Sequence, residues 1–166
     1  MSVRLLEITR EDLPLIERWL HEDHVRRFWG DPAANARLLR EPPAGTRLAV
    51  IEAEGKRAGI VLLQHPSREE LDQAGLTDVP ESVLDLDIMI GEANMTGRGV
   101  GSAAIQLAAE AALSDQTVPF VIAATAVDNE SSLRAFAKAG FRRDREFDDT
   151  LGGRYVLMVR DRARDG

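Results

Sequence analysis

One segment near the middle of the chain alternates cleanly between apolar and polar positions. In residues 83–90, Leu84 and every second residue after it form an apolar face, whereas Asp85, Asp87 and Met89 share the other face. A period of two residues predicts a strand with one buried face. The two aspartates are then neighbours on one face, roughly 7 Å apart along the strand.

The pattern downstream of this strand predicts a crossover connection. Residues 99–113 have helical periodicity, and residues 119–125 form an apolar run that indicates a buried strand. Because a helix joins the two strands, we expect them to lie parallel. Residues 129–139 predict another helix, and residues 142–147 with 154–160 predict a closing hairpin.

The first half of the chain predicts a strand, two helices and a hairpin. Thr9, with Asp12 three positions later, has the spacing of a helix N-cap, and Pro32 after Asp31 marks a second helix start. The expected elements are a strand at 3–8, helices at 9 to about 20 and 31 to about 39, and antiparallel strands at 47–53 and 58–64. The long polar connection at 65–82, with a helical turn expected at 68–74, is interpreted as a pocket lid.

Composition places the chain among ordinary soluble globular proteins. Of its 166 residues, 44% are hydrophobic and 30% are charged, so we expect one domain spanning residues 1–166. The absence of cysteine excludes a disulfide framework and a thiol nucleophile. The N-terminus lacks the apolar core of a signal peptide, so we expect a cytoplasmic protein. A net charge of −7 argues against nucleic-acid binding and favours a cationic partner.

A glycine-rich loop follows the alternating strand and leads into the next helix. Its residues are Gly97, Arg98, Gly99, Val100, Gly101 and Ser102. Glycine permits positive φ and close approach of a ligand to backbone N–H groups, which suits a pyrophosphate at the helix N-terminus. The dinucleotide fingerprint does not fit, because it requires glycine where Ser102 or Ala104 stands, and no Gly-Lys-Ser/Thr motif follows. For the loop alone, an ordinary turn into a helix is the alternative.

Two pairs of residues have both a structural and a functional interpretation. Phe28 and Trp29, beside a glycine, either fill a helix corner or form a wall of an acceptor pocket. Asp85 and Asp87 either are solvated on an exposed strand face or attract an ammonium group and accept its proton. Their position just before the glycine loop favours the functional interpretation of the aspartates.

A second motif makes the glycine loop more specific. An Asn-x-x-Ser-x-x-x-Phe-x-x-x-Gly-Phe pattern runs from Asn129 to Phe141, and together with the loop it resembles the GNAT superfamily of N-acetyltransferases. The resemblance implies an α/β (α+β) fold, with a mixed, mostly antiparallel sheet, helices on both faces and a central parallel strand pair that splays at acetyl-CoA. It also implies a thioester polarised by a strand N–H group. The implied cofactor contacts are Ile88, Met89, Ile90, Asn129 and Phe136, besides the six loop residues.

Within that superfamily, the chain most resembles the aminoglycoside 6′-N-acetyltransferases, followed by lysine-type siderophore acyltransferases. The shared residues include 15–20, 24–25, 28–30, 87–88, 97–101, 138–141 and 156–159. In that subgroup, an aspartate at the position of Asp87 contacts the amine of the drug. Phe136 departs from the tyrosine that acts as general acid in many members, and Gly152 departs from an aspartate of the subgroup. Asp148 and Asp149 lie nearby in the sequence.

These observations lead to the hypothesis of an acetyl-CoA-dependent N-acetyltransferase. Its acceptor is a primary amine of a small cationic molecule, with an aminoglycoside 6′-amine as a candidate. Asp87 is the catalytic candidate, the acceptor contacts are Phe28, Trp29, Asp85 and Asp87, and no metal is expected. The alternatives are an N-acyltransferase for a lysine-like, siderophore or protein amine, and a non-catalytic acyl-CoA-binding module. We expect a monomer or homodimer with no nucleic-acid or membrane partner.

Overall fold

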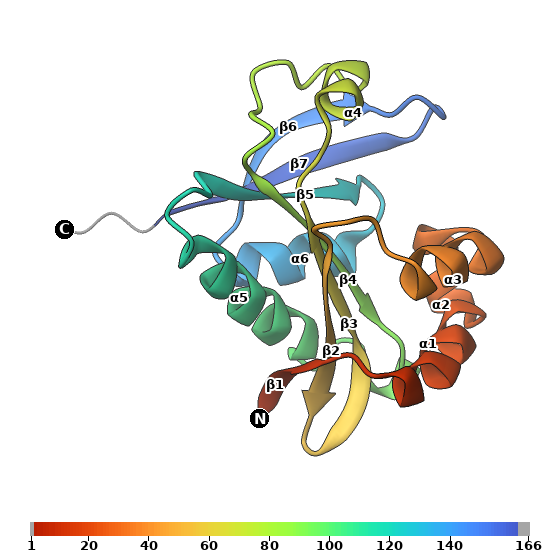
Figure 1. Cartoon of the computed structure of the whole chain (residues 1–166). Coiled ribbons are helices and arrows are strands. Elements are labelled where there is room, and N and C mark those ends of the chain that lie inside the picture. The colour runs from red at the N-terminus through yellow and green to blue at the C-terminus, as the bar shows by residue number, and fades with distance from the viewer. Residues whose placement is uncertain (1, 163–166) are drawn as a thin grey trace.

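Seven strands form one mixed sheet in the computed structural model, which describes residues 2–162 (Figure 1). The strands are β1 (Val3–Glu7), β2 (Arg47–Ala53), β3 (Lys56–Gln64), β4 (Leu84–Ile90), β5 (Phe120–Ala126), β6 (Arg142–Asp148) and β7 (Arg154–Asp161). Their order across the sheet is β1-β2-β3-β4-β5-β7-β6, and β4 with β5 is the parallel pair while the other neighbours are antiparallel. The predicted mixed sheet with a central parallel pair is therefore confirmed.

Helices cover both faces of the sheet. They are α1 (Leu13–Leu20), α2 (Asp23–Trp29), α3 (Pro32–Arg40), α4 (Arg68–Gln73), α5 (Val100–Leu113) and α6 (Glu130–Lys138), with short 3-10 turns at Arg10–Asp12 and Ala93–Met95. Helices α1 to α3 lie on one side of the sheet, and α5 and α6 lie on the other (Figure 1). Within residues 2–162, none of these helices has the length and apolarity needed to cross a membrane.

The predicted helix starts at Thr9 and Asp31 both carry capping contacts, although the first begins as the 3-10 turn Arg10–Asp12 and continues as α1 only from Leu13. The carboxylate of Asp12 accepts hydrogen bonds from the backbone N–H and the hydroxyl of Thr9, at 2.9 and 3.1 Å. At α3, Pro32 occupies the first turn and the Asp31 side chain accepts from the N–H of Ala33. Both arrangements satisfy groups at a helix N-terminus that have no partner within the helix.

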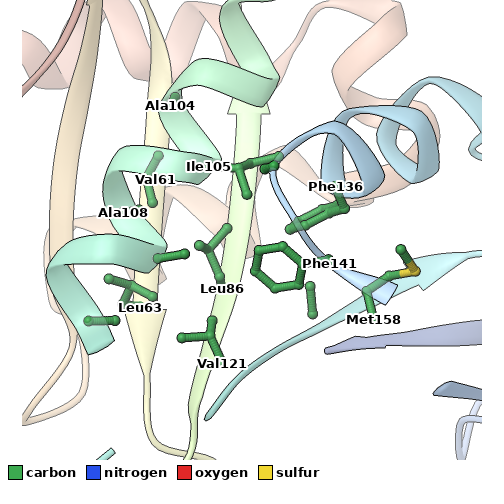
Figure 2. Close-up of a cluster of buried hydrophobic side chains, with 14 of the residues drawn as sticks. Val61, Leu63, Leu86, Ala104, Ile105, Ala108, Val121, Phe136, Phe141 and Met158 are labelled. Carbon is green, nitrogen blue, oxygen red and sulfur yellow. The ribbon is translucent and has the colours of Figure 1, made fainter. Parts of the chain in front are cut away.

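The face of the sheet beneath α5 carries a continuous apolar core. Leu84 and Leu86 of β4 pack there against Ile105 of α5, and all three side chains are buried. Figure 2 shows this cluster, with Ala104, Ile105 and Ala108 of α5 on one side and with Phe141 between Leu86 and Met158. The two phenylalanine rings meet edge to face with centroids 5.1 Å apart. The apolar positions of the alternating strand therefore form this core, as predicted.

The opposite face of the sheet is divided into two separate apolar clusters. One joins α1 to α3 with the sheet through Trp19, Leu20 and Met89. The other joins the α4 segment to β5 and β7 through Leu71, Ile122 and other residues. Asp85 and Asp87 share the face of β4 with Met89, because side chains alternate along a strand. The carboxylates thus occupy the interval between the two clusters.

The interpretation of residues 65–82 as a pocket lid is corrected by the structure. The α4 segment packs as an apolar cluster against β5 and β7, and its loop is held by side chains. Arg68 donates to the carbonyls of Leu76 and Val79 at 3.1 and 2.8 Å, and Arg145 of β6 makes two bonds to Asp78 at 2.7 and 2.8 Å. The segment contains enough apolar side chains to anchor it to the sheet. The many polar residues around them made the connection look like an exposed loop.

Candidate active site

The site is built where the two parallel strands separate. In the described part of the chain, β4 pairs with β5 at two positions only, Leu84 with Val121 and Asp85 with Ile122. Beyond them the strands diverge and a pocket opens between them. Its lining comprises Phe28, Trp29, Leu86, Asp87, Ile88, Ala124, Thr125, Ala126, Asn129, Ser132, Phe136 and Tyr155. This divergence confirms the expected splay of the central pair.

Two side chains of α2 bind the free edge of β4. The indole Nε1 of Trp29 donates to the carbonyl of Ile88 at 3.2 Å, and Nε2 of His24 donates to the carbonyl of Ile90 at 2.9 Å. The adjacent Phe28 also lines the pocket. The aromatic pair therefore has both a pocket role and a packing role, because Trp29 also contacts the α1 to α3 cluster.

Asp87 lines the pocket as a carboxyl group with a raised pKa. Burial raises its pKa from 3.8 to about 6, since a charged carboxylate loses hydration there. Asp85 is half-buried beside the pocket, outside its lining. Its pKa lies well above the ordinary value because of burial, with smaller contributions from the negative charges of Asp87 and Glu70. Its Oδ1 atom is buried and has no hydrogen-bond partner among residues 2–162.

The glycine loop has the backbone geometry of an anion cradle. Gly97 and Gly99 have φ of 71° and 81°, and Gly99 is the N-cap residue of α5. A Cβ atom at Gly99 would have no neighbour within 4 Å in the described part of the chain. The first N–H groups of α5 have no partner within the helix, so they are available to a phosphate group.

Gly101 differs from the other loop glycines. Its φ is not positive, and a Cβ there would lie 3.8 Å from Ala135 of α6 and 3.9 Å from Ile90, which is ordinary contact. Gly101 therefore lies where the start of α5 adjoins α6 and the end of β4, and an added Cβ would fit there. The glycine loop is thus next to the end of β4.

Helix α6 contributes its N-terminus and one aromatic ring to the pocket. Oδ1 of Asn129 accepts from the N–H of Ser132 at 3.2 Å and so caps α6. Phe136 is 2% exposed and also lines the pocket. Its ring has no group that can donate a proton.

Comparison with known proteins places this geometry in a family. Residues 9–149 match the family described as acetyltransferase (GNAT) domain. The chain belongs to the GNAT acetyltransferase family. Among residues 2–162 of this GNAT chain, no group of three or more histidine, aspartate or glutamate side chains is arranged to hold a metal ion.

Similar proteins of known activity include enzymes that modify aminoglycosides. Aminoglycoside N(6')-acetyltransferase type 1 of Klebsiella pneumoniae is 25% identical over 177 aligned residues, which cover 97% of this chain and 84% of the relative. The protein of that name from Serratia marcescens matches equally.

Solved structures agree with the fold of this GNAT chain. Aminoglycoside acetyltransferase AAC(6')-Ib in complex with coenzyme A and kanamycin has a TM-score of 0.81 at 21% identity, covering 97% of this chain and 95% of that one. A spermidine N-acetyltransferase chimera from Vibrio cholerae has a TM-score of 0.71 at 15% identity, covering 97% and 96%. At these identities the structural match establishes the fold.

Six of the fifteen predicted site residues of this GNAT chain line one pocket, namely Phe28, Trp29, Asp87, Ile88, Asn129 and Phe136. The six glycine-loop residues lie outside this lining, and Gly101 lies beside Ala135 and Ile90. The side chain of Met89 faces away, since it is 2% exposed within the α1 to α3 cluster. Val100 is fully buried, so its contribution to a cofactor site is limited to its backbone.

Tyr155 is a pocket residue that the sequence interpretation missed. It is the one tyrosine of the chain, and its ring stacks on Phe147 with centroids 5.8 Å apart. Burial raises the pKa of its phenol, and the nearby carboxylate of Asp149 raises it further. Its position on β7 opposite Ala126 follows from strand register. The alternation of residues 155, 157 and 159 on one face was the available signal.

The two aspartates near Gly152 are engaged outside the pocket. Asp148 accepts a hydrogen bond from Arg154 at 3.1 Å. Oδ1 of Asp149 accepts from the N–H groups of Leu151 and Gly153, at 3.0 and 2.7 Å, and so closes the turn before β7. Neither residue belongs to the pocket lining.

Proposed function

We propose that this protein transfers the acetyl group of acetyl-CoA to a primary amine of a small, multiply cationic molecule, with an aminoglycoside 6′-amine as the first candidate. The supporting observation is Asp87, a carboxyl group with a pKa of about 6 in the pocket where β4 and β5 separate. A base with this pKa is largely ionised at neutral pH and binds the proton of an ammonium group more strongly than an ordinary carboxylate does.

The reaction requires three functions from the chain. The glycine loop and the N-terminus of α5 hold the pyrophosphate, while Ile88, Ile90 and Asn129 flank the pantetheine. A backbone N–H of β4 polarises the thioester carbonyl. Asp87 accepts the proton of the amine directly or through water, and the amine nitrogen then forms a bond to the carbonyl carbon. The nitrogen carries a positive charge after this attack, and as the carbon–sulfur bond breaks it passes one proton, directly or through water, to the leaving thiolate. No covalent enzyme intermediate is needed.

The acceptor side of the pocket supports a cationic substrate. Asp85 and Asp87 supply carboxyl groups on one face of β4, and Phe28 with Trp29 supplies an aromatic wall. Carboxylates attract ammonium groups, and aromatic faces add cation–π attraction. The activity of the aminoglycoside-modifying relatives favours an aminoglycoside over a lysine-like or siderophore amine.

An amine panel tests this proposal. Release of CoA thiol from acetyl-CoA is measured with aminoglycosides that carry or lack a 6′-amine, with spermidine, with lysine and with a lysine-containing peptide. The proposal expects turnover with 6′-amino aminoglycosides and none with their 6′-hydroxy analogues. Turnover confined to lysine or the peptide would replace the proposed acceptor class, and no amine-dependent thiol release would refute the transfer reaction.

A further inference from the structure

Helix α2 is hydrogen-bonded to the edge of β4 that has lost its partner strand. We infer that His24 and Trp29 are positioning residues that hold the end of β4 in its open geometry, and that they thereby connect the acceptor wall to the cofactor strand. The second part of this inference rests on the proposed function, whereas the first concerns the fold alone.

Backbone alternation identifies which edge of β4 these side chains bind. The N–H of Gly91 donates to the carbonyl of Ala58 at 2.8 Å, so the backbone groups of Gly91 point toward β3. Successive residues of a strand direct their N–H and C=O groups to opposite edges. The carbonyls of Ile90 and Ile88 therefore point to the side where β5 would pair, and there they meet His24 and Trp29.

The two side chains replace the hydrogen bonds that β5 does not make. A backbone carbonyl removed from water without a partner costs about 1–3 kcal/mol. Ile88, Ile90, His24 and Trp29 are all half-buried, so this cost applies in part to both carbonyls. With donors from α2 in place, both carbonyls at the end of β4 are hydrogen-bonded although the strand has separated from β5.

The backbone of Trp29 is held by a side chain of α3. Nδ2 of Asn35 donates to the backbone carbonyl of Trp29 at 2.8 Å. Trp29 is the last residue of α2, and the next residue, Gly30, caps the helix with φ of 83°. The Trp29 ring meanwhile lines the pocket on the side of Asp87. One side chain therefore contacts the proposed acceptor site with its ring and fixes the proposed cofactor strand with its N–H.

The opposite end of β4 offers a matched control. Nδ1 of His65 donates to the carbonyl of Val83 at 2.8 Å, just before the part of β4 that pairs with β5. Both His24 and His65 are thus imidazole donors to a backbone carbonyl at an end of the same strand. They differ in whether the neighbouring segment of β4 has a partner strand.

The test uses His24→Leu, which removes the donor, His24→Gln, which retains one, and Trp29→Phe, which keeps a ring without the N–H. His65→Leu is the control. Amide hydrogen exchange at Met89 and Gly91 is measured without ligand and corrected for the change in global stability, and CoA affinity is measured by calorimetry. We expect His24→Leu and Trp29→Phe to lose about tenfold or more of the local protection and of the CoA affinity, a change equal to about 1.4 kcal/mol.

His24→Gln should restore most of both quantities, and His65→Leu should change neither beyond its effect on global stability. Wild-type protection and CoA affinity in both His24→Leu and Trp29→Phe would overturn the inference. If the wild-type protein binds no CoA, the proposed function fails, while exchange at Met89 and Gly91 still decides the positioning role. Trp29→Phe retains most of the ring volume, so it tests the positioning role even if His24→Leu does not fold.

Discussion

The two faces of the sheet differ in how they tolerate polar groups. Beneath α5 and α6, the apolar core is continuous, and the adjoining ligand cradle consists of backbone groups and glycine. On the other face, Asp85 and Asp87 interrupt the apolar surface between two clusters, and Oδ1 of Asp85 has no partner among residues 2–162. Burying such groups is costly, which supports the proposal that the second face carries the acceptor chemistry.

This difference predicts that the two faces fail in different ways. The function of the cradle depends on φ angles and on free space, so changes of shape should damage it most. The acceptor face depends on charge and on proton affinity, so substitutions that preserve shape should damage it.

Gly99→Val should remove CoA binding. A β-branched side chain at φ 81° is strained and stands where the pyrophosphate would approach the backbone. Calorimetry with CoA measures the loss. Gly45→Val is the control, because Gly45 has φ of 85° with no neighbour within 4 Å of its Cβ position in the described part of the chain. Equal CoA affinity in a folded Gly99→Val protein would contradict the cradle assignment.

Asp87→Asn should lower kcat by about 10²-fold, the loss typical of removing a general base. The amide keeps the shape and hydrogen-bonding capacity of the side chain but removes its basicity, so acetyl-CoA affinity should hardly change. Steady-state kinetics with the accepted amine measure both parameters. If the carboxylate only attracts a polycation, KM will rise instead, and the effect will shrink as salt is added.

Asn129→Ala should weaken acetyl-CoA binding by about 1–2 kcal/mol, because a helix cap and a ligand contact are lost together. Thermal stability should fall as well. Ser67→Ala is the matched variant, since Ser67 caps α4 by accepting from the N–H of Glu70 at 3.1 Å, away from the pocket. If both variants lose stability and neither loses affinity, Asn129 is a cap without a ligand role.

Asp85→Asn should have the smallest kinetic effect. Asp85 lies outside the pocket lining, and burial raises its pKa and so disfavours its charged form, so a neutral amide should disturb acceptor binding less here than at Asp87. The KM of a polycationic acceptor should rise by less than about tenfold.

The stability difference between Asp85→Asn and the wild type should change with pH, in favour of the variant as pH rises. The folded protein binds the Asp85 proton more tightly than the unfolded chain does, so the wild type loses stability as pH rises from about 4 through the raised pKa. The melting temperature of Asp85→Asn relative to wild type should therefore increase over this range. A constant difference would show that Asp85 titrates normally.

Local patterns predicted the parts of the site that are continuous in sequence. The alternation of residues 83–90 placed Asp87 opposite the core, and the two motifs located the glycine loop and Asn129. Each of these positions depends on neighbours within a few residues, as helix caps and strand alternation do.

Contacts between distant segments were not predictable in this way. Tyr155 reaches the pocket because β7 pairs with β5, and His24 reaches Ile90 across 66 positions of sequence. The α4 segment was misinterpreted for the same reason, since its apolar residues acquire meaning only when β5 and β7 lie beneath them. These contacts depend on the order of the strands and on the placement of the helices. A local sequence pattern predicts neither of these two features.

The pH dependence of kcat/KM for the amine shows whether Asp87 is the base. Since burial raises the pKa of Asp87 to about 6, the wild-type profile should rise with pH through a limb near that value, in addition to the limb from the amine itself. In Asp87→Asn the limb near 6 should disappear, and the limb from the amine should remain. If Asp87→Asn retains both limbs and the wild-type rate, Asp87 is not the base and the acceptor site has been placed wrongly.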